Sequence, residues 1–214
     1  RLAGEGYAVA IIDHPYGASS ILPDGIILSA SADEALSRID EDPAVLASRM
    51  ADWTADISVT LNELIGGVKG LSIDAKRNVA IGHSIGDAAA LDACANDARL
   101  KACVNMDGAP FGEKVRDQGL SVNAFGILTV ALYSDEELAS RGRTREQWDA
   151  MGKQITGLWA ELAGSGENET VLLRVAGTGH MSFSDAPLVA PSLITQFGGK
   201  PMEPSRDMDV ISGA

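Results

Sequence analysis

The stretch Gly82-His83-Ser84-Ile85-Gly86 decides the fold prediction, because it stands between a strand pattern and a helix pattern. The apolar run 78–81 precedes it, and residues 87–93, which are rich in helix formers, follow it. This order is typical of a nucleophile elbow, a sharp turn that exposes a serine hydroxyl above a helix N-terminus. The two glycines of the motif are expected to let strand and helix approach without Cβ clashes. We predict that Ser84 is a nucleophile and that the backbone N–H of Ile85 stabilises an oxyanion.

Five short apolar runs alternate with helical stretches along the 214 residues. Most of these runs are continuously apolar, which is typical of parallel strands covered on both faces. The pattern predicts an α/β fold: a doubly wound, mostly parallel sheet with helices on both faces, in a single domain over residues 1–214. Active residues of such a sheet lie at the carboxyl ends of its strands. The predicted strands are 7–13, 78–83, 102–106, 126–133 and 170–176.

Two long helices and a hairpin are also expected. A helix is predicted over 43–65, where apolar residues recur at helical spacing and Gly66-Gly67 ends the pattern. A second helix is predicted over 144–163, with Thr144 as its N-terminal cap. The segment 21–28 predicts a hairpin around a Pro-Asp-Gly turn. This hairpin either lines an acyl or leaving-group pocket or is an ordinary insertion.

The composition limits the classes of partner. Thirty Asp and Glu residues against 17 Lys and Arg residues give a formal net charge of −13 and an isoelectric point near 4.5. This acidity argues against nucleic acids and anionic membrane surfaces as partners, since both attract basic proteins. No apolar run is long enough to span a bilayer, so no integral membrane segment is expected.

The two cysteines, Cys94 and Cys103, fall on the helix after the motif and on the next predicted strand. We expect two buried free thiols rather than a disulfide. The three histidines are scattered and there is no C-x-x-C pair, so no metal site is predicted.

A serine nucleophile needs a histidine base, and the chain has only three candidates. His14 follows the first predicted strand, and His83 lies inside the elbow, where its ring should point away from the serine hydroxyl. His180 follows the last predicted strand, in the chain order Ser, acid, His of nucleophile-elbow hydrolases. We therefore predict His180 as the base, presented by a flexible glycine-containing loop, and a structural role for His14.

Two aspartates compete for the role of the acid that orients this base. Many enzymes with this fold carry the acid at the later position, which here is Asp135. Asp135 is followed by two glutamates, however, and fits the solvated acidic start of a helix. Asp107 stands alone at an apolar strand end, where an unpaired carboxylate would be costly to bury. The imidazole N–H of His180 would be its partner, so the predicted triad is Ser84, Asp107 and His180.

Four stretches of the chain together resemble the platelet-activating-factor acetylhydrolase family of α/β-hydrolases. They are residues 1–20, residues 79–86, the strand that ends in Asp107 only 23 residues after the serine, and residues 180–185, which match a His-x-x-Phe-x-Asp ending. The resemblance implies a serine esterase with its acid on the earlier strand and with no metal or organic cofactor. Related bacterial lipases and polyester hydrolases share the elbow, so the elbow does not fix the substrate. The expected partner is a small-molecule or lipid-like ester.

Two features depart from the pattern of that family. Where the family has a second glycine after the motif, this chain has Asp87. A negative charge there should interact favourably with the dipole of the helix and should stabilise the protonated form of His180. A His-Gly-x-Gly-type segment, which supplies a second oxyanion N–H in the family, would lie upstream of Arg1. Residues 206–214 look like the start of a final helix. We therefore expect the chain to be a piece of a longer protein, trimmed at both ends.

The predicted reaction is the hydrolysis of a carboxylic ester through an acyl-enzyme, as in lipases, esterases and acetylhydrolases. Two alternatives stay open. One is a non-catalytic or impaired domain of the same fold that lacks a complete oxyanion hole. The other is acyl transfer by the same triad to an acceptor other than water.

Overall fold

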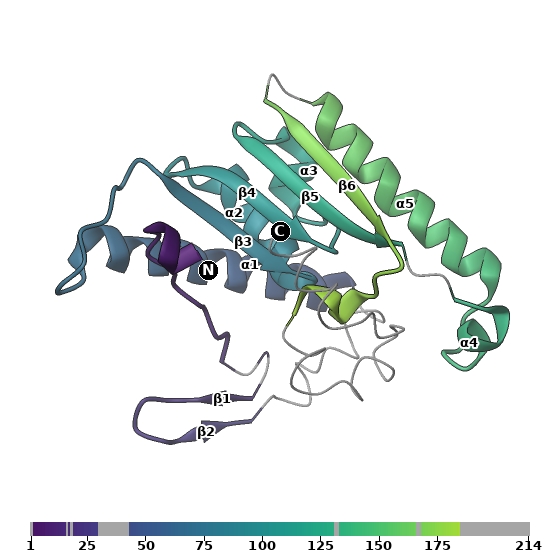
Figure 1. Ribbon diagram of the computed structural model, residues 1–214, viewed down its shortest axis with the longest axis horizontal. Helices are drawn as coiled ribbons and strands as arrows, with labels where there is room; N and C mark the ends of the chain where they lie inside the picture. The colour runs from purple at the N-terminus through teal and green to yellow at the C-terminus, as the bar shows by residue number, and fades with distance from the viewer. Residues whose placement is uncertain are drawn as a thin grey trace.

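A four-stranded parallel sheet with the order β3-β4-β5-β6 forms the centre of the computed structural model (Figure 1). The structure describes residues 2–15, 17, 19–29, 43–130, 133–165 and 168–184. Each strand is joined to the next by a crossover that contains a helix, which is the connection that parallel neighbours require. The strands are β3 (Asn78–His83), β4 (Leu100–Met106), β5 (Asn123–Val130) and β6 (Thr170–Ala176).

One face of the sheet packs against four helices. Its inward side chains include Ala80, Cys103 and Leu128, which form one buried cluster with apolar residues of the helices. Trp159 is 1% exposed, and its ring fills the space over Gly126, where a Cβ would lie 2.7 Å from the ring. The four helices are α1 (Pro43–Gly67), α2 (Ile85–Asn96), α3 (Glu113–Gln118) and α5 (Arg145–Gly164).

The other face of the sheet carries apolar side chains that are partly open. Val79, Ile81 and Leu173 are 45%, 46% and 48% exposed. The sequence predicted helices on this face as well, but no helix of the described residues covers it. The α/β class and the parallel sheet are confirmed, and the runs were continuously apolar because both faces of these strands carry apolar residues.

Local capping signals place the helices where the sequence predicted them. The Thr144 hydroxyl accepts the N–H of Gln147, and the Gln147 side chain accepts the N–H of Thr144, so the two form a capping box at the start of α5. A second capping box, between Ser134 and Glu137, begins the short helix α4 (Asp135–Ala139). Helix α1 begins at Pro43, as predicted, and runs to the end of the Gly66-Gly67 pair.

The strand predicted over residues 7–13 is wrong, because this segment carries no strand. Tyr7, Val9 and Ile11 are 58%, 55% and 92% exposed. A strand forms only where a neighbour completes its hydrogen bonds, and no described segment pairs with this one. The chain before it forms only a short 3₁₀ turn, η1 (Leu2–Glu5).

The hairpin prediction is confirmed, with β1 (Ser20–Ile21) antiparallel to β2 (Ile27–Leu28). Gly25 has φ +84° in the turn, and the Asp24 carboxylate accepts the N–H of Ile26 at 3.1 Å. Figure 1 shows the hairpin projecting away from the central sheet.

The expectation of free thiols is wrong, because Cys94 and Cys103 form a disulfide. Cys94 lies on α2 and Cys103 on the adjacent strand β4, and both are 1% exposed. Their Cα atoms are 6.5 Å apart, which is within the range that a disulfide spans. The final helix expected over 206–214 and residue Asp185 lie outside the described residues.

Candidate active site

Ser84 lies at the junction of β3 and α2, where the backbone turns sharply. Its φ of 60° and ψ of −124° are costly for a residue with a side chain. A Cβ on Gly82 would lie 2.2 Å from the carbonyl oxygen of Gly86, so strand and helix meet only because position 82 is glycine. A Cβ on Gly86 would meet nothing within 4 Å. The prediction that both glycines are needed for the close approach of strand and helix is therefore wrong for Gly86.

The structure brings Ser84, His180 and Asp107 into one hydrogen-bonded chain. Nε2 of His180 lies 2.8 Å from the Ser84 hydroxyl oxygen. Nδ1 of the same ring lies 2.7 Å from Oδ2 of Asp107. The three residues come from the end of β3, the turn after β4 and the 3₁₀ turn η4 (His180–Phe183). After β6 the chain returns across the carboxyl ends of the strands to η4 (Figure 1).

Asp107 is held as a hydrogen-bond acceptor. The backbone N–H of Thr129 donates to its Oδ1 at 2.7 Å, while the His180 ring occupies Oδ2. Burial acts to raise the pKa of Asp107, but the hydrogen bonds from His180 and Thr129 outweigh it, and the pKa lies below its usual value. The carboxylate is therefore charged at neutral pH, and it fixes the Nδ1–H tautomer of His180.

Ser84 and Asp107 are the only residues other than glycine with a positive φ in the part of the chain that the structure describes, and both have φ 60°. Such backbone strain persists where the surrounding structure imposes it, and it gathers at functional sites. The two strained positions are also the two residues that hydrogen-bond with the ring nitrogens of His180.

His83 contacts the candidate base His180, an interaction that the sequence analysis did not predict. Its Nε2 lies 2.7 Å from the backbone carbonyl oxygen of His180 and donates to it, and the two rings lie 4.6 Å apart. Burial, together with His180, lowers the pKa of His83, so its ring is neutral at neutral pH. The only signal in the sequence was a histidine beside the candidate nucleophile.

The loop that presents His180 contains hydrogen bonds of its own. The Thr178 hydroxyl donates to the carbonyl of Val175 at 2.6 Å, and the N–H of Gly179 donates to the Ser182 hydroxyl at 3.0 Å. Thr178 and Ser182 are 1% and 2% exposed. Both buried hydroxyls therefore have a hydrogen-bond partner within the loop.

Asp135 lies at the first position of α4 and does not contact the base. Its side chain is 83% exposed, and Oδ1 accepts a hydrogen bond from Nε of Arg145 at 3.0 Å. It is therefore the solvated acidic helix start that its sequence context indicated, and of the two candidate acids only Asp107 meets His180.

His14 makes a separate contact with a carboxylate. Its Nδ1 lies 2.7 Å from Oδ2 of Asp56, and its ring stacks on Trp53 with centroids 4.4 Å apart and an angle of 4°. Gly17 completes this arrangement, because a Cβ there would lie 3.0 Å from the Trp53 ring.

Asp87, the residue at the glycine position of the family pattern, is fully buried at 0% exposure. Burial first, and the charge of Asp107 second, raise its pKa well above the usual value. This environment disfavours the charged carboxylate that the sequence analysis expected at this position.

The backbone N–H of Ile85 lies at the start of α2. Ile85 is the first residue of this helix, directly after Ser84, so its N–H has no acceptor inside the helix. The helix dipole adds positive potential at the same place. This N–H is therefore a candidate donor to an oxyanion.

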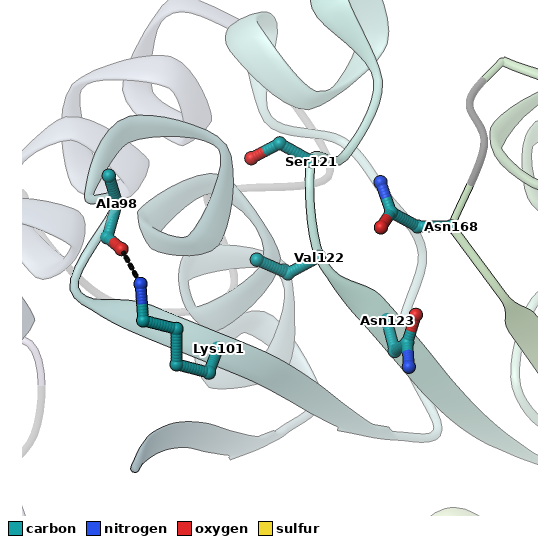
Figure 2. Close-up of a pocket in the computed structure, with 6 residues that line it drawn as sticks. All are labelled: Ala98, Lys101, Ser121, Val122, Asn123 and Asn168. Carbon is teal, nitrogen blue, oxygen red and sulfur yellow. Dashed lines mark hydrogen bonds between the residues drawn. The ribbon is translucent and has the colours of Figure 1, made fainter. Parts of the chain in front are cut away.

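A cavity of about 430 Å³ lies elsewhere, at the amino ends of β4 and β5 (Figure 2). Residues that direct chemistry lie at the carboxyl ends of a parallel sheet, so this cavity is at the opposite edge. Two of its polar side chains have partners: Lys101 donates to the carbonyl of Ala98, and Asn168 donates to that of Leu120. Figure 2 shows its lining, which consists of Ala98, Lys101, Ser121, Val122, Asn123 and Asn168.

Two searches of the described residues give negative results. None of their His, Cys, Asp and Glu side chains form a group of three or more that is placed to hold a metal ion. None of the described helices combines the length and the apolar character needed to cross a membrane.

The comparisons with known proteins agree with this geometry. The family model described as platelet-activating factor acetylhydrolase, isoform II, matches residues 59–213, which include all three residues of the hydrogen-bonded chain. No curated protein matches the sequence significantly.

Two solved structures share the fold. One is a ferulic acid esterase from Streptomyces cinnamoneus, with a TM-score of 0.68 and 24% sequence identity over 94% of this chain and 54% of the esterase. The chain therefore spans about half the length of that protein. The other is a dienelactone hydrolase-like promiscuous phosphotriesterase from metagenomic libraries, with a TM-score of 0.51 and 14% identity over 89% of this chain and 69% of the phosphotriesterase. Both matches identify an α/β-hydrolase fold, as the sequence predicted.

Proposed function

Since the chain belongs to the platelet-activating factor acetylhydrolase, isoform II, family, we propose that it is a serine hydrolase of carboxylic esters. The observation that carries the proposal is the continuous hydrogen-bonded path from the Ser84 hydroxyl through the His180 ring to the Asp107 carboxylate, with steps of 2.8 and 2.7 Å. A hydroxyl activated by an oriented imidazole is the arrangement that acyl transfer needs.

In the proposed reaction Ser84 Oγ attacks the ester carbonyl carbon while Nε2 of His180 takes the hydroxyl proton. The carbonyl oxygen becomes an oxyanion, which the N–H of Ile85 and the α2 dipole stabilise. The C–O bond to the alcohol then breaks, and His180 returns the proton to the leaving oxygen. Water repeats the same steps on the acyl-enzyme and releases the acid.

Asp107 orients the base and stabilises its charged form. When His180 becomes an imidazolium, the negative charge of Asp107 stands 2.7 Å from the protonated Nδ1. The hydrogen bond from Thr129 holds the carboxylate in place during this change. The carboxylate accepts no proton itself.

The proposed substrates are small-molecule or lipid-like esters. The name of the matched family refers to an acetyl ester of a lipid, and the name of the first structural neighbour to an ester of ferulic acid. We propose the same reaction for this chain and treat its catalytic unit as a single domain.

A fluorophosphonate probe tests the proposal, because it forms a stable bond only with an activated serine. The full chain should be labelled at Ser84, as located by mass spectrometry of the peptides, and should hydrolyse a p-nitrophenyl ester. The Ser84→Ala variant should lose both properties. The matched control is Ser121→Ala, an exposed serine beside the cavity of Figure 2, which should keep both. Absence of labelling in the folded wild-type protein contradicts the proposal and supports a non-catalytic domain.

A further inference from the structure

Asp87 is a buried ionisable group that the proposed mechanism does not use. It is the third residue of α2, the helix that begins directly after Ser84, and its side chain is 0% exposed. Its carboxyl group packs against the backbone of Gly108, where a Cβ would lie 1.8 Å from Oδ1 and 2.2 Å from Oδ2. The carboxyl therefore lies between the helix that begins at the elbow and the turn that carries Asp107.

Neither oxygen of the Asp87 carboxyl makes a hydrogen bond within normal distance and angle limits to a group in the described part of the chain. Burial, together with the charge of Asp107, raises the pKa of this carboxyl by more than the nearby Asn105 side chain and Ser84 backbone lower it. The side-chain amide nitrogen of Asn105, on β4, is also buried without a partner there. Burial of an unpaired charge is costly, whereas a neutral carboxylic acid is much cheaper to bury. The site therefore fits a carboxyl group that keeps its proton.

The charged and titratable groups near Asp87 do not offer the compensation that an ionised carboxylate needs. Asp107, at the end of β4, is itself negative and disfavours a second negative charge. His83, at the end of β3, is held neutral, and the His180 ring is bonded to Asp107. On α1, which packs against α2, the buried Arg49 guanidinium makes no ion pair with a carboxylate of the described residues.

We propose that Asp87 carries a proton in the active enzyme and that its ionisation sets the alkaline limit of turnover. This inference rests on the proposed esterase function. Asp87 touches no reacting atom, so it is a positioning residue that acts through the electrostatic field of the elbow.

The position of Asp87 determines the direction of the effect. The developing oxyanion depends on the first N–H of α2 and on the positive end of that helix. A carboxylate in the first turn of the same helix repels the oxyanion and offsets this potential, whereas the neutral acid leaves it intact. The positive charge that forms on His180 is already balanced by Asp107 at 2.7 Å, so a further negative charge there adds less.

The test is the pH profile of kcat/KM for wild type and Asp87→Asn. Asparagine has the shape of the protonated acid but cannot ionise. The wild-type profile should fall about tenfold per pH unit on its alkaline side, as expected for one ionisation. The Asp87→Asn profile should keep the acid limb and lose this alkaline limb.

Asp92→Asn is the matched control, because Asp92 is another buried carboxylate of α2 but has partners. The side chain of Asn96 donates to its Oδ2 at 3.1 Å, and the N–H of Val115 donates to its Oδ1 at 3.4 Å. This variant should be less stable but should keep the wild-type alkaline limb. An alkaline limb that persists in Asp87→Asn, or an acid limb that this variant shifts, overturns the proposal.

A second measurement separates this inference from the esterase proposal, because it needs no turnover. Infrared difference spectra of Ser84→Ala and Ser84→Ala/Asp87→Asn at neutral pH should differ by the carbonyl stretch of one protonated carboxyl group. That band should disappear as the pH rises through the same range as the alkaline limb. If the band is absent, the inference fails even when the probe labels Ser84; if the band is present and labelling fails, the esterase proposal alone fails.

Discussion

Two histidine–carboxylate pairs in the described part of the chain have the same nitrogen–oxygen distance but different surroundings. In both, Nδ1 of the ring lies 2.7 Å from a carboxylate oxygen: His180 with Asp107 and His14 with Asp56. The other nitrogen of the His180 ring lies 2.8 Å from the Ser84 hydroxyl. The His14 ring instead stacks on Trp53, so its faces serve packing.

The carboxylates of the two pairs also differ. The Asp107 side chain is 12% exposed and takes a second hydrogen bond from a backbone N–H, whereas that of Asp56 is 45% exposed. Water screens an exposed pair and competes for its hydrogen bonds, so the Asp56 pair fixes its ring less firmly. In the proposed mechanism a histidine–carboxylate pair can activate a nucleophile only where a hydroxyl, here on a strained backbone, meets the second nitrogen of the ring.

The largest difference in kcat is expected between the variants in which His180 or His14 is replaced. His180→Ala removes the proposed base and should lower kcat for ester hydrolysis by roughly 10⁴- to 10⁶-fold, as loss of a triad histidine does elsewhere. His14→Ala removes a stacked ring and its contact with the half-exposed Asp56, which should cost about 1 kcal/mol of stability and leave kcat within a few-fold of wild type. Steady-state kinetics and thermal unfolding of both variants check this contrast, and equal losses of kcat would show that the two pairs do not differ in function.

Replacing the carboxylates of the two pairs should also affect kcat unequally, with a smaller loss than replacement of His180 causes. Asp107→Asn keeps the size of the side chain but favours the wrong tautomer of His180, so kcat should fall by roughly 10⁴-fold. Asp56→Asn, the matched change in the exposed pair, should leave kcat close to wild type. Of these two variants, only Asp107→Asn should react more slowly with the fluorophosphonate probe than wild type does. An unchanged labelling rate in Asp107→Asn would exclude Asp107 as the orienting acid.

The acid stability of the protein should depend on Asp107. Its pKa is lowered in the folded state, so its ionisation stabilises the fold above the unfolded pKa of about 3.9 and loses this effect as the pH falls through the lower, folded value. The difference in unfolding free energy between wild type and Asp107→Asn should therefore shrink below about pH 4. Urea unfolding from pH 3 to pH 7 measures it. Asp56→Asn is the control, and a pH-independent difference for Asp107→Asn would contradict the prediction.

The parts of the fold that the sequence predicted well are those with local causes. Strand β3, the elbow and α2 follow from a strand pattern, one glycine and a helix pattern in order. The start of α5 follows from the capping box at Thr144, whose two bonds join residues only three apart. The candidate acid was also chosen locally, because a lone carboxylate at an apolar strand end needs a partner nearby.

The predictions that failed depend on contacts between distant segments. The run 7–13 has the composition of a strand, but a strand needs a neighbour, which composition does not reveal. The disulfide requires Cys94 and Cys103 to face each other across a helix–strand contact. Asp87 was expected to be charged because acidic residues suit the first turn of a helix, yet packing against Gly108 buries it. The bond from His83 to the carbonyl of His180 likewise joins residues 97 positions apart.

The smallest expected effect concerns Asp135, the acid that the sequence analysis ranked second. Its side chain is 83% exposed, and its ion pair with Arg145 lies at the surface, where such pairs contribute little. Asp135→Asn should therefore leave kcat/KM within about twofold of wild type, because no proton transfer in the proposed mechanism involves a solvent-screened carboxylate on α4. Asp135→Asn and Asp107→Asn should be measured in the same assay, because both variants remove one negative charge and keep the side-chain shape. A loss of a hundredfold or more in Asp135→Asn, with Asp107→Asn near wild type, would transfer the role of the acid to the later strand and require the loop before α4 to move toward His180.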